Sequence, residues 1–327
     1  IVTGVTISNM IIEKYATPAN GGWGTIAAPN GHGWIVSNVE ARLNHATAIV
    51  VGTNGQVLNN NVHHNGLNSI GAYAATNLLI QGNDVSYNGA LFDAFWGAAG
   101  MKLAFISNSI IRSNNSHHNF GGGLWCDIDC TGITFELNTA ADNAQFGIMY
   151  ELSYNAIIRN NIIRNNGFSL DGGPAQGGIF IASSKDVEIS GNTLTDNKWG
   201  IIAYQEPRGS GVYGPWVTEN LNVHDNTVTM SQAGINGLIQ TQGDNTFYTS
   251  RNNRWTNNSY YLPAASDLDF HWNNTNLSFA GWQAAGQDVG GTMIVGRPGT
   301  STTTDTTPPS VPTNLTATPI STSQINL

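Results

Sequence analysis

One phrase of apolar and polar residues recurs along most of the chain. Each copy has β-branched residues, an asparagine, four further residues, a second asparagine and then an apolar strand led by glycine. The shortest step between copies is 22 residues, which leaves room for three short alternating β segments. The chain is therefore predicted to be a stack of similar β coils. The first asparagines of the copies are Asn38, Asn60, Asn83, Asn114, Asn138, Asn160, Asn192, Asn226 and Asn252.

The second asparagine of the phrase keeps a constant distance from the first. Five residues after eight of the nine first asparagines, seven of the eight residues are asparagine. Stacked strands lie about 4.8 Å apart, so an asparagine at an equivalent turn of every coil can pass its amide hydrogen bond to the next. The pattern predicts an asparagine ladder. The eight residues are Asn65, Asn88, Asn119, Asn143, Asn165, Asn197, Ser231 and Asn257.

This repeat predicts an all-β fold, a right-handed parallel β-helix of about ten coils. The alternative is a helical protein with asparagine-rich loops, and period-two segments such as DVEIS and GIIAY argue against it. The ladder and strand pattern resemble the pectate-lyase-like group of carbohydrate-active β-helix proteins across roughly residues 1–260. The resemblance implies a polysaccharide substrate. It indicates no single family, because the GHG at 31–33 lacks the aspartate pair of the polygalacturonase signature and the pectate lyase WiDH string is missing.

The longer steps and the chain ends predict the domain organisation. Insertions at residues 89–99, 168–177 and 205–218 are expected to be loops on one face that border a groove. Residues 262–297 lose the repeat and are expected to cap the solenoid, which makes 1–297 one domain. Residues 298–310 form a Thr/Pro linker, and 311–327 resemble the truncated start of a fibronectin type III domain. Such strings are common in secreted bacterial enzymes, so an extracellular protein is expected. The first residues lie inside an alternating apolar run, IVTGVTIS, which is interpreted as a mature or trimmed N-terminus.

Composition limits the partners. Twelve Lys and Arg residues against twenty-one Asp and Glu residues give a net charge of −9, which disfavours nucleic acid and anionic membranes. The apolar runs are too short to cross a bilayer, and a monomer is expected. The two cysteines, Cys126 and Cys130, exclude a disulfide scaffold and a four-cysteine zinc site. An extended strand would hold them about 13 Å apart, so both are predicted to be buried thiols.

Alignment of the glycine-led strands gathers charged residues on one sheet. Alternation from the leading glycine turns Lys102, Asp127, Asp129 and Glu151 outward on three successive coils. Only 10% of the chain is charged, so this concentration is unusual. Two carboxyl groups at such a short distance cannot both ionise freely, so the pKa of one of them should rise. Glycoside hydrolysis needs a carboxyl group with a raised pKa beside an ionised carboxylate. We predict that the acid and the base are two of Asp127, Asp129 and Glu151. The alternative is a salt-bridged or calcium-binding patch around Lys102.

Aromatic residues near this sheet are candidates for sugar binding. Trp125, Phe180 and Tyr204 continue the outward face, and Trp96 and Trp216 lie in two insertions. Alternatively, Trp125 and Phe180 cover the sheet under a loop. Two histidine pairs, His63–His64 and His117–His118, occupy equivalent turns, which suits either acid–base and metal chemistry or repeat architecture. His118 joins the candidate substrate-binding residues.

These features predict a secreted polysaccharide-degrading enzyme, with a glycoside hydrolase as the first hypothesis. It needs no cofactor. The first alternative is a polysaccharide lyase in which Lys102 is the base and the acidic patch holds Ca²⁺. The second is a non-catalytic β-helix that binds carbohydrate or serves adhesion.

Overall fold

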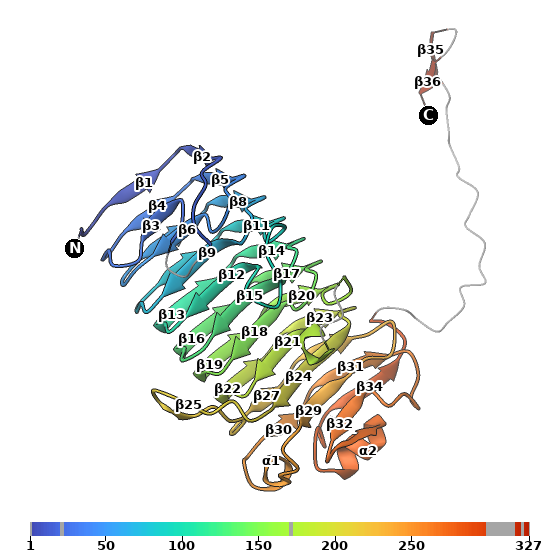
Figure 1. The fold of residues 1–327 in the computed structure, drawn as a ribbon. Helices are drawn as coiled ribbons and strands as arrows, with labels where there is room; N and C mark the ends of the chain where they lie inside the picture. Colours follow the sequence, from blue (N-terminus) through green and yellow to red (C-terminus); the bar gives the residue numbers. More distant parts are fainter. Residues whose placement is uncertain (1, 20–22, 170–172, 299–317, 322–323, 327) are drawn as a thin grey trace. The chain divides into compact units, whose positions relative to one another are not determined.

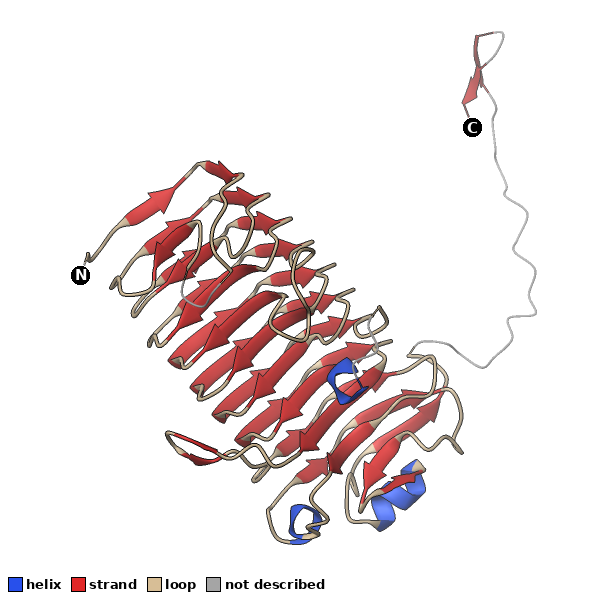
Figure 2. Ribbon diagram, in the orientation of Figure 1, coloured by secondary structure: helices blue, strands red, loops and turns tan. Residues whose placement is uncertain are grey.

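The computed structural model describes residues 2–19, 23–169, 173–298, 318–321 and 324–326 (Figure 1). Three long sheets make up the unit of residues 1–297. The chain winds from one sheet to the next, and each coil adds one strand to each sheet. Pairing between successive coils is parallel throughout, apart from the final pair, β32 with β33. The predicted parallel β-helix is confirmed, and Figure 2 shows how little of it is helical.

Sheet 1 has ten strands. They are β1 (Thr6–Ser8), β4 (Ile35–Ser37), β7 (Gln56–Leu58), β10 (Leu79–Gln81), β13 (Ser107–Arg112), β16 (Thr131–Glu136), β19 (Tyr154–Arg159), β22 (Lys185–Ser190), β27 (Asn222–His224) and β30 (Arg254–Thr256). Sheet 2 has eleven. They are β2 (Ile11–Glu13), β5 (Glu40–Arg42), β8 (Asn61–His63), β11 (Asp84–Ser86), β14 (Asn115–His117), β17 (Thr139–Ala141), β20 (Ile162–Arg164), β23 (Thr193–Thr195), β28 (Thr227–Thr229), β31 (Ser259–Leu262) and β34 (Thr292–Val295).

Sheet 3 carries the glycine-led strands and the candidate site. Its strands are β3 (Ile26–Ala28), β6 (Ile49–Val51), β9 (Asn68–Tyr73), β12 (Ala99–Ala104), β15 (Gly122–Asp127), β18 (Ile148–Glu151), β21 (Gly177–Ala182), β24 (Trp199–Gln205), β29 (Asn236–Gln240), β32 (Phe270–Trp272) and β33 (Thr275–Leu277). The predicted insertions leave the solenoid beside this sheet. The second holds the short helix η1 (Gly173–Gln176), and the third holds a hairpin of β25 (Ser210–Gly211) and β26 (Gly214–Pro215).

The core is a set of stacked apolar columns. Alternate residues of each strand point inward, and the in-register pairing places them directly above one another. One column on sheet 1 runs through nine coils, and all its side chains are buried. A single coil could not bury such a face, so stacking supplies the stability. The column is Val36, Val57, Ile80, Ile111, Phe135, Ile158, Ile189, Val223 and Trp255.

Two asparagine ladders run along the solenoid. In each, the side-chain oxygen of one asparagine accepts from the main-chain and side-chain N–H groups of the asparagine one coil earlier. The first is Asn60, Asn83, Asn114, Asn138, Asn161, Asn192, Asn226 and Asn258, and it ends on Asp288. The second is Asn44, Asn65, Asn88, Asn119, Asn143, Asn166 and Asn197.

Several predicted ladder positions are wrong by one residue. Asn160, Asn165 and Asn257 have left-handed backbones at the turn, and the following asparagine joins the ladder instead. Asn38 is also left-handed, and its coil has Val39 at the ladder position. Asn252 is left-handed too, and its neighbour Asn253 accepts from the N–H of Leu221. Adjacent asparagines cannot be told apart by spacing, because only the backbone conformation decides which one turns inward.

The last coils are closed by aromatic packing. Trp282 of α2 (Phe279–Ala284) stacks on Phe270 at 5.2 Å and packs edge-on against Trp255 and Trp272. A short helix, α1 (Thr246–Thr249), precedes β30. Neither these helices nor any other in the described ranges is long and apolar enough to cross a membrane.

Residues 298–327 form a second unit, in which β35 (Thr318–Ser321) pairs antiparallel with β36 (Gln324–Asn326). The predicted linker at 298–310 and the fibronectin-like start at 311–327 fall mainly outside the described residues.

Candidate functional site

A single row of side chains crosses six strands of sheet 3. The register pairs the end of each strand, from β9 to β24, with the end of the next. The two carboxylates occupy the centre of the row, small residues flank them, and a tyrosine stands at each end. The predicted stacking of Asp127 on Glu151 is confirmed. The row is Tyr73, Ala104, Asp127, Glu151, Ala182 and Tyr204.

Asp127 is held in an ion pair with Lys102. Lys102 Nζ lies 3.1 Å from Asp127 Oδ2, and both side chains are about one-fifth exposed. The ammonium group also sits 3.6 Å from the centre of the Trp125 ring and donates to the main-chain oxygen of Trp96 at 3.2 Å. These contacts stabilise a negative charge on Asp127, because an ammonium group partly removed from water favours an ionised neighbour.

Glu151 is in a different environment. Burial raises the pKa of Glu151 to about 7, and the nearby charge of Asp127 adds to the rise. Arg208, Lys102 and the indole N–H of Trp125 act in the opposite direction. Arg208 Nη1 lies 3.2 Å from Glu151 Oε1. The predicted rise in the pKa of one carboxyl group is therefore present at Glu151, which changes charge near neutral pH.

Asp129 does not continue the outward series, contrary to the alternation prediction. Strand β15 ends at Asp127, and Ile128 and Asp129 both have left-handed backbones. The Asp129 carboxylate turns to the hairpin insertion, where it accepts from the indole N–H of Trp216 at 3.0 Å and the main-chain N–H of Val212 at 3.3 Å. Burial, followed by the Asp129 charge, raises the pKa of Tyr154 to about 12. Asp129 and Trp216 thus join the hairpin to the solenoid.

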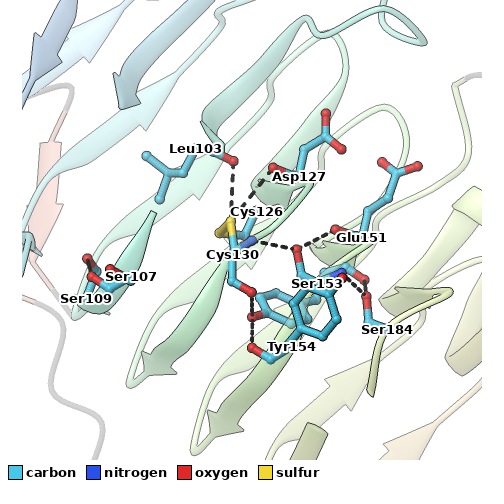
Figure 3. The surroundings of a disulfide bond; sticks show 11 residues. Leu103, Ser107, Ser109, Cys126, Asp127, Cys130, Glu151, Ser153, Tyr154 and Ser184 are labelled. Atoms are coloured by element: carbon cyan, nitrogen blue, oxygen red, sulfur yellow. Dashed lines mark hydrogen bonds between the residues drawn. A yellow bond between two sulfur atoms is a disulfide. The ribbon is translucent and has the colours of Figure 1, made fainter. Parts of the chain in front are cut away.

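The cysteines form a disulfide, so the prediction of two free thiols is wrong. Cys126 and Cys130 are 6.4 Å apart between Cα atoms because the turn at Ile128 and Asp129 folds the chain back. The distance expected for an extended strand therefore does not apply. Figure 3 shows the bridge beside the strand ends that carry Asp127 and Glu151.

One cavity lies on the Glu151 side of the row. Its volume is about 290 Å³, and its lining includes Trp125, Phe180, Tyr204 and Arg208. Trp125 and Phe180 are only 5% and 4% exposed, and they pack in one cluster with Phe146 and Met149 under the insertions. These two side chains therefore form the floor of the cavity and do not present an exposed stacking surface. The full lining is Ala94, Phe95, Trp125, Gln145, Phe146, Met149, Glu151, Ala175, Phe180, Ala182, Tyr204, Glu206 and Arg208.

A second cavity lies on the Asp127 side. It measures about 260 Å³ and is lined by Asp127, Lys102 and the aromatic residues Trp23, Tyr73, Trp96 and Phe105, among others. Trp96 is among the predicted sugar-binding residues, whereas Trp23, Tyr73 and Phe105 are not. Tyr73 could have been found, because it ends the glycine-containing strand one coil before Lys102 and aligns with Asp127.

His118 lies elsewhere. It follows β14 on sheet 2 and stacks against Tyr87 at 5.1 Å, while His64 stacks on the other side of the same ring at 4.9 Å. The equivalent histidine pairs therefore build a column of rings over successive coils. Neither cavity beside the row includes His118 in its lining.

The carboxylates of the acidic patch are each paired with a nitrogen group. Ca²⁺ takes six to eight oxygen ligands. Here Asp127, Glu151 and Asp129 are each engaged by nitrogen groups, from Lys102, Arg208 and the hairpin. Within the described part of the chain, no three His, Cys, Asp or Glu side chains gather in an arrangement that could hold a metal ion.

Comparison with known proteins identifies the family. A family model described as "Right handed beta helix region" matches residues 24–192 and 136–214, which is more than half of the chain. The chain belongs to this right-handed β-helix family. A comparison with curated proteins gave no match.

Solved structures similar to this β-helix protein act on or bind carbohydrates. The A-module of the Azotobacter vinelandii mannuronan C-5 epimerase AlgE6 is 16% identical, with a TM-score of 0.53, over 82% of this chain and 65% of that one. The tailspike of E. coli bacteriophage HK620 in complex with a pentasaccharide is 12% identical, with a TM-score of 0.53, over 82% and 52%. Pectate lyase Pel9A is 10% identical, with a TM-score of 0.52, over 85% and 71%. At these identities the likeness shows the fold alone. The chain spans between half and two thirds of the epimerase module and the tailspike.

Proposed function

We propose that this β-helix protein is a polysaccharide-degrading glycoside hydrolase in which Glu151 is the general acid and Asp127 its ionised partner. The observation that carries the proposal is the contrast between two adjacent carboxyl groups. Glu151 has its pKa raised to about 7, whereas Asp127 is paired with Lys102 at 3.1 Å. One group that holds a proton beside one that has lost it is the arrangement glycosidic cleavage requires.

The proposed reaction uses the chain's own side chains. Glu151 donates its proton to the glycosidic oxygen as the bond to the anomeric carbon breaks, and Asp127 stabilises the positive charge that develops on the sugar. Adjacent strands lie about 4.8 Å apart, close to the separation of about 5 Å typical of retaining enzymes. We therefore expect Asp127 to attack the anomeric carbon and form a glycosyl-enzyme. Water, deprotonated by Glu151, then displaces the Asp127 carboxylate, so the product keeps its configuration.

The substrate is proposed to be a chain that lies along the row and occupies both cavities. Small residues on each side of the carboxylates leave space for sugar rings, and the tyrosines at the ends offer stacking surfaces. The two cations that line the cavities are already paired, Lys102 with Asp127 and Arg208 with Glu151 and Glu206. A neutral glycan suits these cavities better than a polyanion, which would need unpaired cations.

The lyase alternative rests on Lys102 and on the fold shared with a pectate lyase. Lys102 Nζ, however, contacts Asp127, the Trp125 ring and the Trp96 carbonyl, which favours a role in holding Asp127 over that of a base. A non-catalytic carbohydrate-binding protein is the remaining alternative. We also propose an extracellular location, because the disulfide between Cys126 and Cys130 suits an oxidising compartment.

The test is product analysis on a panel of neutral and acidic polysaccharides. New reducing ends without the ultraviolet absorbance of a C=C bond would support a hydrolase, and that absorbance would instead indicate a lyase. Glu151→Gln should lower kcat by about 10²–10⁴-fold. Glu136→Gln is the matched control, because Glu136 makes a comparable ion pair with Arg159 on sheet 1, away from the row. Binding without any cleavage by the wild type would overturn the enzyme proposal.

A further inference from the structure

The proposed partner of the acid lies inside a small covalent loop. Asp127 directly follows Cys126, and the disulfide to Cys130 closes the chain around Asp127, Ile128 and Asp129. Both cysteines are fully buried. Since β15 ends at Asp127, the direction of this side chain depends on the turn that follows it.

That turn has a conformation its sequence disfavours. Ile128 has a φ of 53° and Asp129 a φ of 55°, both in the left-handed region. A β-branched residue is rarely found there, because its side chain crowds the backbone. The neighbouring coils have the same left-handed turn at Phe105 and Leu152, but Ile128 is β-branched. It is held by its main-chain N–H, which donates to the Glu151 oxygen at 3.0 Å, and by the disulfide that spans it.

The same corner is bonded to the backbone behind Glu151. The main-chain N–H of Cys130 donates to Ser153 Oγ at 3.1 Å, and Ser153 Oγ donates to the main-chain oxygen of Glu151 at 2.6 Å. Cys130 Sγ also contacts the main-chain oxygen of Asp127 at 3.8 Å. Figure 3 shows this sequence of contacts beneath the two carboxylates. This side-chain link adds to the main-chain bond that the N–H of Ile128 already donates to the Glu151 oxygen at 3.0 Å.

We propose that the Cys126–Cys130 disulfide is a positioning element of the carboxylate pair, which holds the turn at Ile128 so that Asp127 stays opposite Glu151. The site then forms fully only in the oxidised protein. The catalytic meaning of this inference rests on the proposed function, but the geometric claim does not. Because the sulfurs are buried, the bridge acts as a permanent brace that is set when the protein folds.

The experiment compares the wild type with the double variant Cys126→Ala/Cys130→Ala. Without the bridge, Asp127 should move away from Glu151, and its contribution to the raised Glu151 pKa should be lost. A ¹³C NMR titration should then give a lower Glu151 pKa in the double variant than in the wild type. On a cleaved substrate, kcat should fall at least tenfold and the alkaline limb of the pH profile should move to lower pH, with circular dichroism unchanged.

Two serine variants separate positioning from general stability. Ser153→Ala removes the side-chain link from Cys130 to the Glu151 oxygen and should also lower the Glu151 pKa. Ser109→Ala is the matched control. Its hydroxyl makes the same two bonds on β13, accepting from the N–H of Leu78 and donating to the main-chain oxygen of Ser107. This variant should lose stability without moving the Glu151 pKa.

The outcomes distinguish this inference from the proposed function. An unchanged Glu151 pKa in both the double variant and Ser153→Ala would overturn the positioning role, whatever the activity. A lower pKa in a protein that cleaves no glycan would keep the positioning role and overturn the hydrolase. If the double variant does not fold, Ser153→Ala against Ser109→Ala decides the question alone.

Discussion

At the scale of single residues, the site depends on giving two similar groups unlike surroundings. Asp127 and Glu151 are in register on neighbouring strands, yet Lys102 contacts the first at 3.1 Å while burial dominates the second. Arg208 reaches Glu151 from an insertion 57 residues further along the chain. It limits how far the pKa of Glu151 rises, because a nearby cation favours the carboxylate. The result is a carboxyl group that changes charge near neutral pH.

This raised pKa predicts a pH-dependent stability that Glu151→Gln should remove. The pKa of Glu151 is about 7 in the folded protein, against an ordinary value of 4.5, so the folded state keeps a proton that the unfolded chain has released. The stability due to this proton is complete below about pH 4.5 and is lost as the pH rises to about 7. Relative to the wild type, the variant should gain on the order of 3 kcal/mol between pH 4.5 and 8.

Urea unfolding of both proteins at several pH values measures this difference. Asp269, whose pKa burial raises to about 6, is present in both proteins and cancels in the comparison. Parallel pH profiles for the two proteins would contradict the raised Glu151 pKa.

At the scale of elements, the side-chain amides of the asparagine ladders hold the turns between strands. Each inner member of the first ladder accepts two hydrogen bonds through its oxygen and donates to a main-chain carbonyl and to the next asparagine. The ladder therefore satisfies buried backbone groups that a tight bend would leave unpaired. It also keeps successive coils in one register, which is what places Asp127 beside Glu151.

Removal of one ladder member should destabilise the solenoid. Asn138→Ala loses the bonds to Asn114, Asn161 and Ile111 and leaves their buried groups unpaired, at a cost of about 2–4 kcal/mol. Asn115→Ala is the control, because Asn115 makes one part-buried bond, to Asp84, and should cost less than about 1 kcal/mol. Thermal unfolding of the two variants is the measurement. Equal losses would contradict the ladder's role.

At the scale of the whole molecule, the proposed groove exists only because six coils are stacked. The row from Tyr73 to Tyr204 crosses five strand spacings, which is about 24 Å. Its centre lies between the two cavities, so sugar rings on both sides of the scissile bond would be held. Such an arrangement favours cleavage within a chain over release of single units from an end.

The groove predicts that affinity depends on chain length. In the Glu151→Gln background, affinity for neutral oligosaccharides should rise with length until the chain reaches both tyrosines. Tyr73→Ala or Tyr204→Ala should each weaken binding of long chains about tenfold, and of short ones much less, because only long chains reach both ends. Tyr15→Ala is the control, since Tyr15 is exposed and outside the row. Isothermal titration calorimetry checks this. Length-independent affinity would rule the row out as the binding surface.

The repeat and the alternation of side chains determined the coil stack, the sheet that carries the site and the pairing of Asp127 with Glu151. These features follow from local periodicity, because strands stacked in register turn sequence spacing into spatial neighbours. The same reasoning could not choose between adjacent asparagines such as Asn160 and Asn161, whose difference lies in backbone conformation.

Only the tertiary structure decided what departs from the period. The left-handed turn at Ile128 and Asp129 closes the disulfide and sends Asp129 to the hairpin, although alternation pointed it outward. The insertions bury Trp125 and Phe180 and bring Arg208 to Glu151. Insertions follow no repeat, so their contacts depend on how each loop folds back over the sheet. The charge of Glu151 depends on those same contacts, because burial and neighbouring charges set a pKa and both come from the folded chain.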